Sequence, residues 1–297
     1  MKINDIVIED TFAEVFSMNI ARILITAATR RWALESALET KGLGRSATIP
    51  PSEASVERAA NETETPDNRP GYILQVGDRK RKELDYWLVT RIRKGVVPIT
   101  TTAVFDALPP NLAKDFVEIE RTSVQMFGDG YEKVIDIFGR EMYQIPRMDG
   151  FLYVEKKFGV AKGVAGGNFL IMADSQGSAL LAAEMALEAM IEIPYVTGRL
   201  SASGTKVGGN VYKDAVATTN DLYCACISDR VKNTKIPPGV NCVYEMIVNG
   251  LTLEDLKKSM QAGLEKAISV KGVKKITAGN YDGKLGKDFI YLRDLVG

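Results

Sequence analysis

The sequence repeats one order of elements, and this repeat constrains the fold more than any other feature. In each half an apolar run precedes an amphipathic stretch, a polar excursion, a second apolar run and a second amphipathic stretch. The first copy occupies 20–26, 30–41, 50–71, 72–76 and 81–94, followed by extended chain at 96–104. The second copy occupies 169–173, 175–191, 194–240, 242–248 and a helix that Thr252 can cap.

Setting Tyr244 on Tyr72 brings the apolar positions of the two copies into register. The matched positions are Val76 with Val248, Leu84 with Leu256, Leu88 with Met260 and Ile92 with Leu264. The repeat predicts an α+β protein of two ferredoxin-like (split βαβ) lobes from an internal duplication, with helices packed on mainly antiparallel sheets. We expect the lobes to be residues 1–146 and 147–297, with 151–160 as the crossover.

Composition excludes several kinds of site. The chain has no histidine, so it cannot form a Ser-His or Cys-His nucleophile pair or a His-ligated zinc or haem site. Its 38 basic and 38 acidic residues give zero formal net charge, which argues against nucleic-acid binding. The sequence contains no run of about 18 uncharged apolar residues, the length that a membrane-spanning helix needs.

The three cysteines, Cys224, Cys226 and Cys242, indicate a reduced setting. An odd number at this spacing argues against a disulfide framework. The N-terminal residues carry charges every few positions and show no export signal. We therefore expect a cytoplasmic protein whose thiols are packed or unreactive rather than metal ligands.

Three glycine-containing stretches match nucleotide motifs in part but lack the right context. Residues 42–47 fit G-x-G-x-x-A, yet they follow a helix rather than a strand, so we interpret them as a helix C-cap turn. Residues 279–284 are one residue short of a P-loop and are followed by Leu285 where Ser or Thr is needed. Residues 204–206 read Gly-Thr-Lys, which reverses the Gly-Lys-Thr order of a P-loop. A nucleotide-dependent ligase is a further alternative function, and it holds only if the protein is shown to bind ATP.

Two further stretches are candidates for contact with a ligand. Gly166 and Gly167 precede a buried strand, where glycine permits close approach to the backbone or a positive φ, although a tight turn explains them equally well. Residues 174–176 lie at a strand-to-helix junction, where free amides could hold an anionic or carbonyl group. Asp174 as an ordinary N-cap is the commoner explanation there.

Glu245 is the most informative single residue. In a strand over 243–248, Val243, Glu245 and Ile247 share one side, and both sides are apolar apart from this carboxyl. The matching position in the first copy is Ile73, so the fold itself has no need for a charge there. We expect burial to raise the pKa of Glu245, so that the protonated form can donate a hydrogen bond to a developing oxyanion. The alternative is an edge strand with the carboxyl in water.

The C-terminal segment is basic. Its lysines are Lys271, Lys274, Lys275, Lys284 and Lys287, with Asn280 and Tyr281 among them. Most such runs are solvated turns, but this one would suit carboxylates or phosphate on a substrate tail if a cleft lies nearby.

Seven ordered segments resemble the formylmethanofuran:tetrahydromethanopterin formyltransferase family, and together they span nearly the whole chain. The segments are 10–14 (DTFAE), 64–67 with 69–71 (ETPD, RPG), 101–105 (TTAVF), 166–169 (GGNF), 201–204 (SASG), 244–245 with 249–251 (YE, NGL) and 278–281 with 283–286 (AGNY, GKLG). Each match is weak alone, and the set is specific.

The resemblance implies a cytoplasmic one-carbon enzyme of archaea or methylotrophs. Such an enzyme moves a formyl group from the amine of methanofuran to N5 of tetrahydromethanopterin, with these two carriers as cosubstrates and with no metal or covalent cofactor. It also implies two-lobed subunits that form homodimers or homotetramers, with the cleft at the subunit interface, and no nucleic-acid or membrane partner. Because a pterin N5 is itself nucleophilic, the reaction needs positioning and oxyanion stabilisation rather than a histidine base.

The resemblance also implies roles for individual residues. The carboxyl that matches Glu245 stabilises the tetrahedral intermediate in the family. By motif position we predict a substrate-binding set of Gly166, Gly167, Asn168, Ser175, Gln176, Thr101, Thr102, Phe105, Ser203, Asn280 and Lys284.

The chain departs from the family pattern at residues 46–54, 94–96 and 195–199. Loops of this kind line clefts and carry specificity. The alternatives are a non-catalytic carrier-binding or complex-forming subunit, and formyl transfer on a different carrier.

Overall fold

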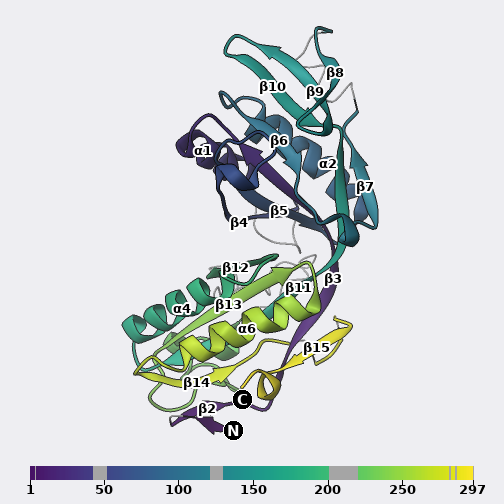
Figure 1. Ribbon diagram of the computed structural model, residues 1–297. Helices are drawn as coiled ribbons and strands as arrows, with labels where there is room; N and C mark the ends of the chain where they lie inside the picture. Colours follow the sequence, from purple (N-terminus) through teal and green to yellow (C-terminus); the bar gives the residue numbers. More distant parts are fainter. Residues whose placement is uncertain are drawn as a thin grey trace. The chain divides into compact units, whose positions relative to one another are not determined.

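The computed structural model describes residues 1–3, 5–42, 52–120, 130–200, 220–280, 282–284 and 286–296. The chain divides into two compact units, which we call the central unit (18–162) and the terminal unit (1–17 with 163–297). Both chain ends belong to the terminal unit (Figure 1). The strands β3 (Phe12–Thr26) and β11 (Lys157–Ala173) each contain one unit boundary.

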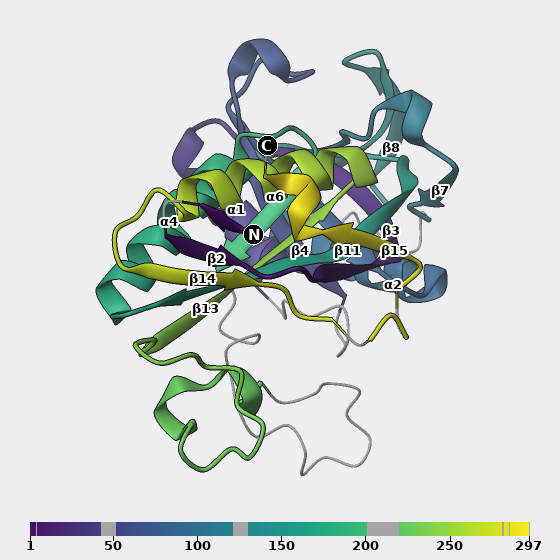
Figure 2. The same cartoon turned by 90° about the horizontal axis from the view of Figure 1, so that it is seen from below.

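The first 17 residues join the C-terminal half through strand pairing. Strand β2 runs parallel to β14, with Ile8 opposite Ile276 (Figure 2), and β15 pairs with the start of β3. The division at 146/147 expected from the repeat stays a prediction, and these pairings show why contacts divide the chain elsewhere.

The central unit contains one βαββαβ motif. After β3 come α1 (Arg30–Lys41), β4 (Glu53–Ala60), β5 (Gly71–Asp78), α2 (Arg81–Arg91) and β6 (Ala103–Asp106). Pairing gives the strand order β4-β5-β3-β6, with β3 antiparallel to both neighbours. The remaining strands are β7 (Asp115–Glu118), β8 (Lys133–Ile137), β9 (Arg140–Arg147) and β10 (Gly150–Glu155), and β10 extends the sheet beyond β6.

The terminal unit repeats the motif. Its elements are β1 (Lys2–Ile3), β2 (Ile6–Ile8), the later part of β11, α4 (Gln176–Ile191), β12 (Val196–Leu200), β13 (Cys242–Gly250), α6 (Leu253–Ala267), β14 (Val273–Thr277) and β15 (Asp288–Tyr291). Pairing gives the order β12-β13-β11-β14. This is the strand order of the central unit, so two ferredoxin-like α+β units are confirmed.

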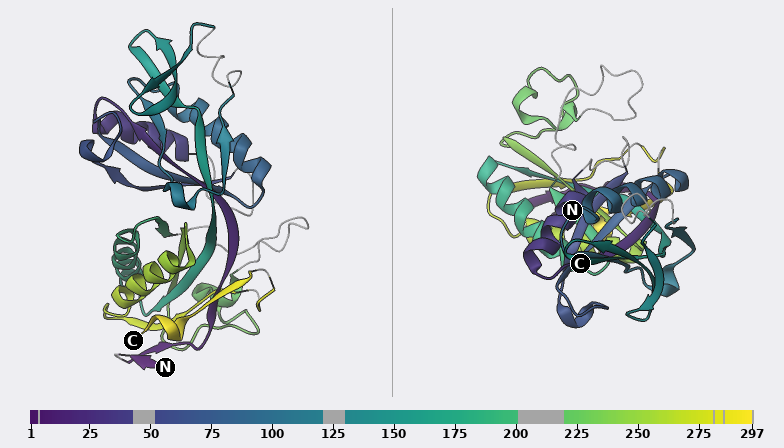
Figure 3. Two further views of the ribbon diagram at one scale, coloured as in Figure 1. Left: turned by 45° about the vertical axis from the view of Figure 1, so that its right-hand side comes forward. Right: turned by 90° about the horizontal axis from the view of Figure 1, so that it is seen from above.

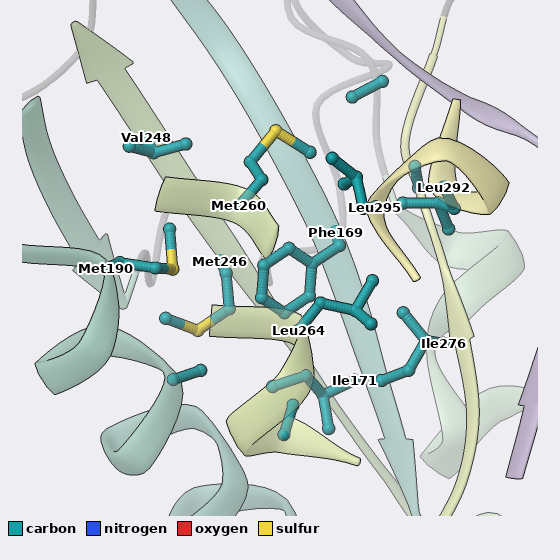
Figure 4. Close-up of a cluster of buried hydrophobic side chains, with 14 of the residues drawn as sticks. Phe169, Ile171, Met190, Met246, Val248, Met260, Leu264, Ile276, Leu292 and Leu295 are labelled. Carbon is teal, nitrogen blue, oxygen red and sulfur yellow. The ribbon is translucent and has the colours of Figure 1, made fainter. Parts of the chain in front are cut away.

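One face of the terminal sheet packs against two helices. Helices α4 and α6 lie side by side along this face (Figures 1 and 3). Phe169 is fully buried among side chains of β13, β14 and α6 (Figure 4). Thr252 caps α6 as expected, since its Oγ1 accepts from Asp255 N at 3.1 Å. Burying each large apolar side chain here stabilises the unit by about 1.5–3 kcal/mol.

Several expected boundaries are wrong in detail. The stretch 50–71 is not only an excursion, because it contains β4 and the fully buried Ala54. Extended chain at 96–104 is limited to the end, because Ile92–Val96 forms a π-helical turn and β6 begins at Ala103. The supposed crossover 151–160 consists of β10 and the start of β11, and the stretch 194–240 contains β12. Gly42 is the C-cap of α1, as predicted.

Candidate active site

Glu245 lies in the middle of the terminal sheet, on the face turned away from the helices. It is on β13, which pairs with β11 on one side and β12 on the other, so the edge-strand alternative is wrong. Its side chain is half-buried, and its direct cross-strand partner is Leu170, which is 3% exposed. Phe169 and Met246, the next residues along, point to the helices (Figure 4).

The two units differ in chemistry at this place. In the central unit, Leu24 pairs with Ile73 and with Phe105, and the three belong to one apolar cluster. In the terminal unit the same register pairs Leu170 with Glu245 and with Thr277. The pairing therefore supports setting Glu245 on Ile73. One copy of the repeat has two polar side chains where the other has two apolar ones.

Asn168 fastens the end of β14 to β11 beside this position. Its Oδ1 accepts from Gly279 N at 2.7 Å, and its Nδ2 donates to Gly279 O and to Gly166 O, both at 3.0 Å. Both amide hydrogens are thus used within the protein. The structure places Asn168 near Glu245 but gives it a bridging task rather than a free amide for a substrate.

Gly279 lies directly beside the carboxyl. A Cβ atom at position 279 would lie 3.8 Å from Glu245 Oε1 and 3.3 Å from Asn168 Oδ1. A side chain at this position would therefore crowd Asn168 and come into contact with the carboxyl. Residues 279–284 are not followed by a helix, so they do not form a P-loop.

Gly166 and Gly167 form a bulge in β11. The register with β13 shifts between Val164 and Gly167, and Gly166 has φ +91°, which favours glycine. Gly166 N donates to Asn249 Oδ1 at 3.1 Å. A Cβ at Gly167 would meet Leu256 and Val248 at 3.0 Å, so this glycine allows α6 to approach the sheet.

Asn280 and Lys284 follow Gly279 but have different surroundings. Asn280 Nδ2 donates to Thr11 Oγ1 and Phe12 O, both at 3.1 Å, and ties this loop to β3. Lys284 is exposed, and its Nζ lies 3.5 Å from an Asp282 carboxylate oxygen. The other lysines of the segment include Lys274 and Lys275, which pair with Asp174 and Glu9.

Ser175 and Gln176 lie at the opposite end of β11. They follow Ala173, which lies three residues beyond Leu170, the cross-strand partner of Glu245. Because a strand rises about 3.3 Å per residue, Ser175 and Gln176 lie more than about 10 Å from Leu170 along the strand direction. Ser175, not Asp174, caps α4, because its backbone is extended and its Oγ accepts from Ser178 N at 3.2 Å. Gln176 is exposed in the first turn of the helix.

Three predicted residues belong to the central unit. Thr101 has φ +61°, and its Oγ1 accepts from Ala28 N at 3.1 Å. Thr102 is fully buried and donates to backbone carbonyls of the preceding turn. Phe105 is fully buried in the apolar cluster. Thr102 and Phe105 are thus buried within this unit, and their place in the substrate-binding set stays a prediction. Ser203 lies outside the described residues.

Glu9 is a carboxylate that the sequence analysis missed. It lies on the same face of the terminal sheet as Glu245, the face turned away from the helices. Glu9 forms an ion pair with Lys275, whose Nζ lies 2.8 Å from Glu9 Oε2, and Thr277 lies close to the same carboxylate. Burial acts to raise the pKa of Glu9, but these two side chains lower it overall. No sequence signal marked Glu9, because its partners lie more than 260 residues away in the chain.

Within the described ranges, no three His, Cys, Asp or Glu side chains are placed to hold a metal ion. In the same ranges, no helix combines the length and apolar character needed to cross a membrane.

Family models match both halves of the chain. Residues 1–147 match the model described as formylmethanofuran-tetrahydromethanopterin formyltransferase, and residues 150–295 match the model of the proximal lobe of that family.

Similar proteins match over their full length. The chain is 46% identical to a formylmethanofuran–tetrahydromethanopterin formyltransferase of Methanocaldococcus jannaschii, over 99% of each chain. It is 46% identical to the protein of the same name from Methanosarcina mazei, over 99% of this chain and 100% of the relative.

Solved structures agree with these matches. The formylmethanofuran:tetrahydromethanopterin formyltransferase of Methanosarcina barkeri superposes with a TM-score of 0.90 at 44% identity, over 99% of this chain and 100% of that one. A chain of the formyltransferase/hydrolase complex of Methylorubrum extorquens, solved with methylofuran, gives a TM-score of 0.89 at 30% identity, over 99% and 98%.

Proposed function

The chain belongs to the formylmethanofuran–tetrahydromethanopterin formyltransferase family, and we propose from this that it transfers a formyl group from formylmethanofuran to N5 of tetrahydromethanopterin. One observation carries the assignment: identity of 46% extends over 99% of both this chain and its relative. Methanofuran and tetrahydromethanopterin are then the carrier cosubstrates.

The reaction is an acyl transfer between two amines. N5 attacks the formamide carbon, and the C=O π electrons move to oxygen to form a tetrahedral oxyanion. The C–N bond to methanofuran then breaks, and the N5 proton passes to the departing amine. N5 is a weakly basic amine that is free to attack at neutral pH, so the protein must mainly position the carriers and stabilise the oxyanion.

Glu245 is the residue we assign to the oxyanion. Its carboxyl is half-buried on a central strand, directly beside Gly279. Protonated, it donates a hydrogen bond to the oxyanion, and it can relay the proton that N5 loses to the leaving amine. Asn168 supports it by holding Gly279 in place.

The other predicted contacts are narrower proposals. Gly166, Gly167 and Asn168 shape the wall near Glu245, while Asn280 and Lys284 follow along the same loop. Ser175 and Gln176, at the other end of β11, would contact only a distant part of a carrier. We also propose that the protein acts in the cytoplasm as a homodimer or homotetramer, as the family resemblance implies.

A direct assay tests the function. Purified protein is mixed with formylmethanofuran and tetrahydromethanopterin, and formation of formyl-tetrahydromethanopterin is followed by absorbance and confirmed by mass spectrometry. We expect turnover without added metal or nucleotide. Binding of both carriers without product would overturn the enzymatic assignment.

A complex-forming subunit is the second candidate, and one observation favours it. The Methylorubrum extorquens chain of nearly the same fold is part of a formyltransferase/hydrolase complex. Its identity to this chain is 30%, against 46% for the Methanocaldococcus jannaschii relative, so the transferase remains the better assignment. The same assay separates the two, because a subunit without activity of its own would show no turnover.

A further inference from the structure

Cys224 and Cys226 lie close together in the terminal unit. Cys224 lies between two consecutive short 3-10 helices, Asp221–Tyr223 and Ala225–Ile227, and Cys226 belongs to the second of them. Their sulfur atoms are 3.3 Å apart, close enough for one thiol to donate a hydrogen bond to the other. Both are free thiols, and the third cysteine, Cys242, is at the start of β13.

The two thiols differ in exposure. Cys226 is exposed, whereas Cys224 is half-buried. Burial, and then the hydrogen bond with Cys226, raise the pKa of Cys224. A reagent in solution therefore meets Cys226 first, and Cys224 keeps its proton and can donate it to a Cys226 thiolate.

We propose that Cys224 and Cys226 form a redox modification site, a dithiol that small aliphatic disulfides convert to an internal disulfide. The Cys226 thiolate attacks one sulfur of the reagent, forms a mixed disulfide and releases the first thiolate. Cys224 loses its proton to that thiolate and attacks the Cys226 sulfur, so that the second thiolate leaves and takes up from water the proton that Cys226 had released. The protein pair loses two electrons and two protons, and the reagent is reduced to two thiols.

Geometry favours closure over a lasting mixed disulfide. A disulfide needs a sulfur separation of about 2.05 Å, so the 3.3 Å gap must close by little more than about 1 Å. The two Cα atoms are at most about 7 Å apart, since only one residue separates them, which is near the usual range for disulfides. Attack by Cys224 is intramolecular, so it outruns attack by a second reagent molecule.

The proposal goes beyond formyl transfer and does not depend on it. In a reducing compartment such a pair rests as the dithiol and is oxidised only transiently, as redox-sensing cysteines are. The small ring that closes across one residue keeps the disulfide easy to reduce.

The test uses the full chain, reduced and then incubated with hydroxyethyl disulfide at neutral pH. Iodoacetamide quenches the reaction, and intact mass and peptide mapping follow without reductant. We expect loss of two hydrogen atoms, no reagent adduct and a single alkylated cysteine, Cys242. Dithiothreitol should restore three alkylatable thiols.

Three variants make the test specific. Cys224→Ser should keep a stable mixed disulfide on Cys226, whereas Cys226→Ser should form no internal disulfide. Cys242→Ser is the matched control and should close as the wild type does, with circular dichroism confirming the fold of each. A lasting adduct on the wild-type protein, a disulfide that includes Cys242, or loss of closure in Cys242→Ser would overturn the proposal.

Discussion

Leu170 on β11 and Glu245 on β13 are a direct cross-strand pair, in the same register as Leu24 and Ile73 in the other copy of the repeat. Duplication thus produced two equivalent positions, and only one of them carries a carboxyl. Because Ile73 shows that the fold accepts an apolar residue there, Glu245 is best explained by chemistry rather than by stability.

The three hydrogen bonds of the Asn168 side chain should contribute measurably to the stability of the protein. Asn168→Ala removes three hydrogen bonds and leaves Gly279 N and two carbonyls without their side-chain partner. We expect the free energy of unfolding to fall by about 1–3 kcal/mol, measured by urea denaturation. Asn241→Ala is the control, because that exposed amide makes one bond, to Asp174 O, and its loss should cost less than about 1 kcal/mol.

Gly166 should tolerate no side chain. Its φ is +91°, and an added Cβ would lie 2.7 Å from a ring carbon of Phe16. Gly166→Ala should therefore lower the free energy of unfolding by more than about 1 kcal/mol. Gly177→Ala, in α4 with no atom within 4 Å of its Cβ, should be neutral or stabilising by up to about 1 kcal/mol. Equal effects in thermal unfolding would contradict the bulge geometry.

Gly279 should control access to the carboxyl. Gly279→Ala adds a methyl group 3.8 Å from Glu245 Oε1 and close to Asn168 Oδ1. We expect kcat/KM to fall roughly tenfold to a hundredfold with the fold retained, because small displacements at a reacting centre have effects of that size. Steady-state kinetics with both carriers check this, and an unchanged kcat/KM would separate Gly279 from the site.

The central unit should show a pH dependence that comes from Asp106. Burial raises the pKa of Asp106, and burial likewise raises that of Glu155, which accepts from Asp106 N at 2.7 Å. A raised pKa in the folded state means that the folded protein binds more protons than the unfolded chain. The contribution to stability is therefore full below the ordinary pKa of 3.8 and is lost as pH rises through the folded pKa.

The measurement compares wild type with Asp106→Asn, because other carboxylates also titrate in this range. On acidification from neutral pH toward about 4, the unfolding free energy of the wild type should rise relative to the variant. A difference that does not vary with pH would show that Asp106 has no raised pKa.

The sequence predicted the helices and the repeat because their signals are local. Thr252 and the apolar stripe after it define α6, and the apolar spacing within α1 and α4 marked these helices, although the cap of α4 is Ser175 rather than Asp174. Strand β4 was missed because its buried residues include Glu57, which pairs with Arg22, 35 residues earlier, and accepts a hydrogen bond from Gln75. A buried ion pair between distant residues looks like a polar loop in the sequence.

The candidate site was predictable only at its centre. Glu245 is conspicuous as one charge in an apolar strand, and that pattern needs no knowledge of tertiary structure. The roles of Asn168 and Asn280 depend on partners more than 100 residues away, so motif position alone could not separate bridging from substrate binding. Phe105 was assigned to the site by its motif. Its burial depends on Met142 of β9 and Tyr153 of β10, which come 37 or more residues later in the sequence.

The account depends most on Glu245, and single-turnover formyl transfer at saturating carriers tests it directly. Glu245→Ala should slow the transfer step by about 2–4 kcal/mol, roughly 30-fold to 1,000-fold, and Glu245→Gln should retain part of the rate because its amide can still donate a hydrogen bond. Glu254→Gln, an exposed carboxyl on α6 that pairs with Lys258, is the matched control and should behave as wild type. A Glu245→Ala protein that folds, binds both carriers and transfers formyl at the wild-type rate would contradict the account.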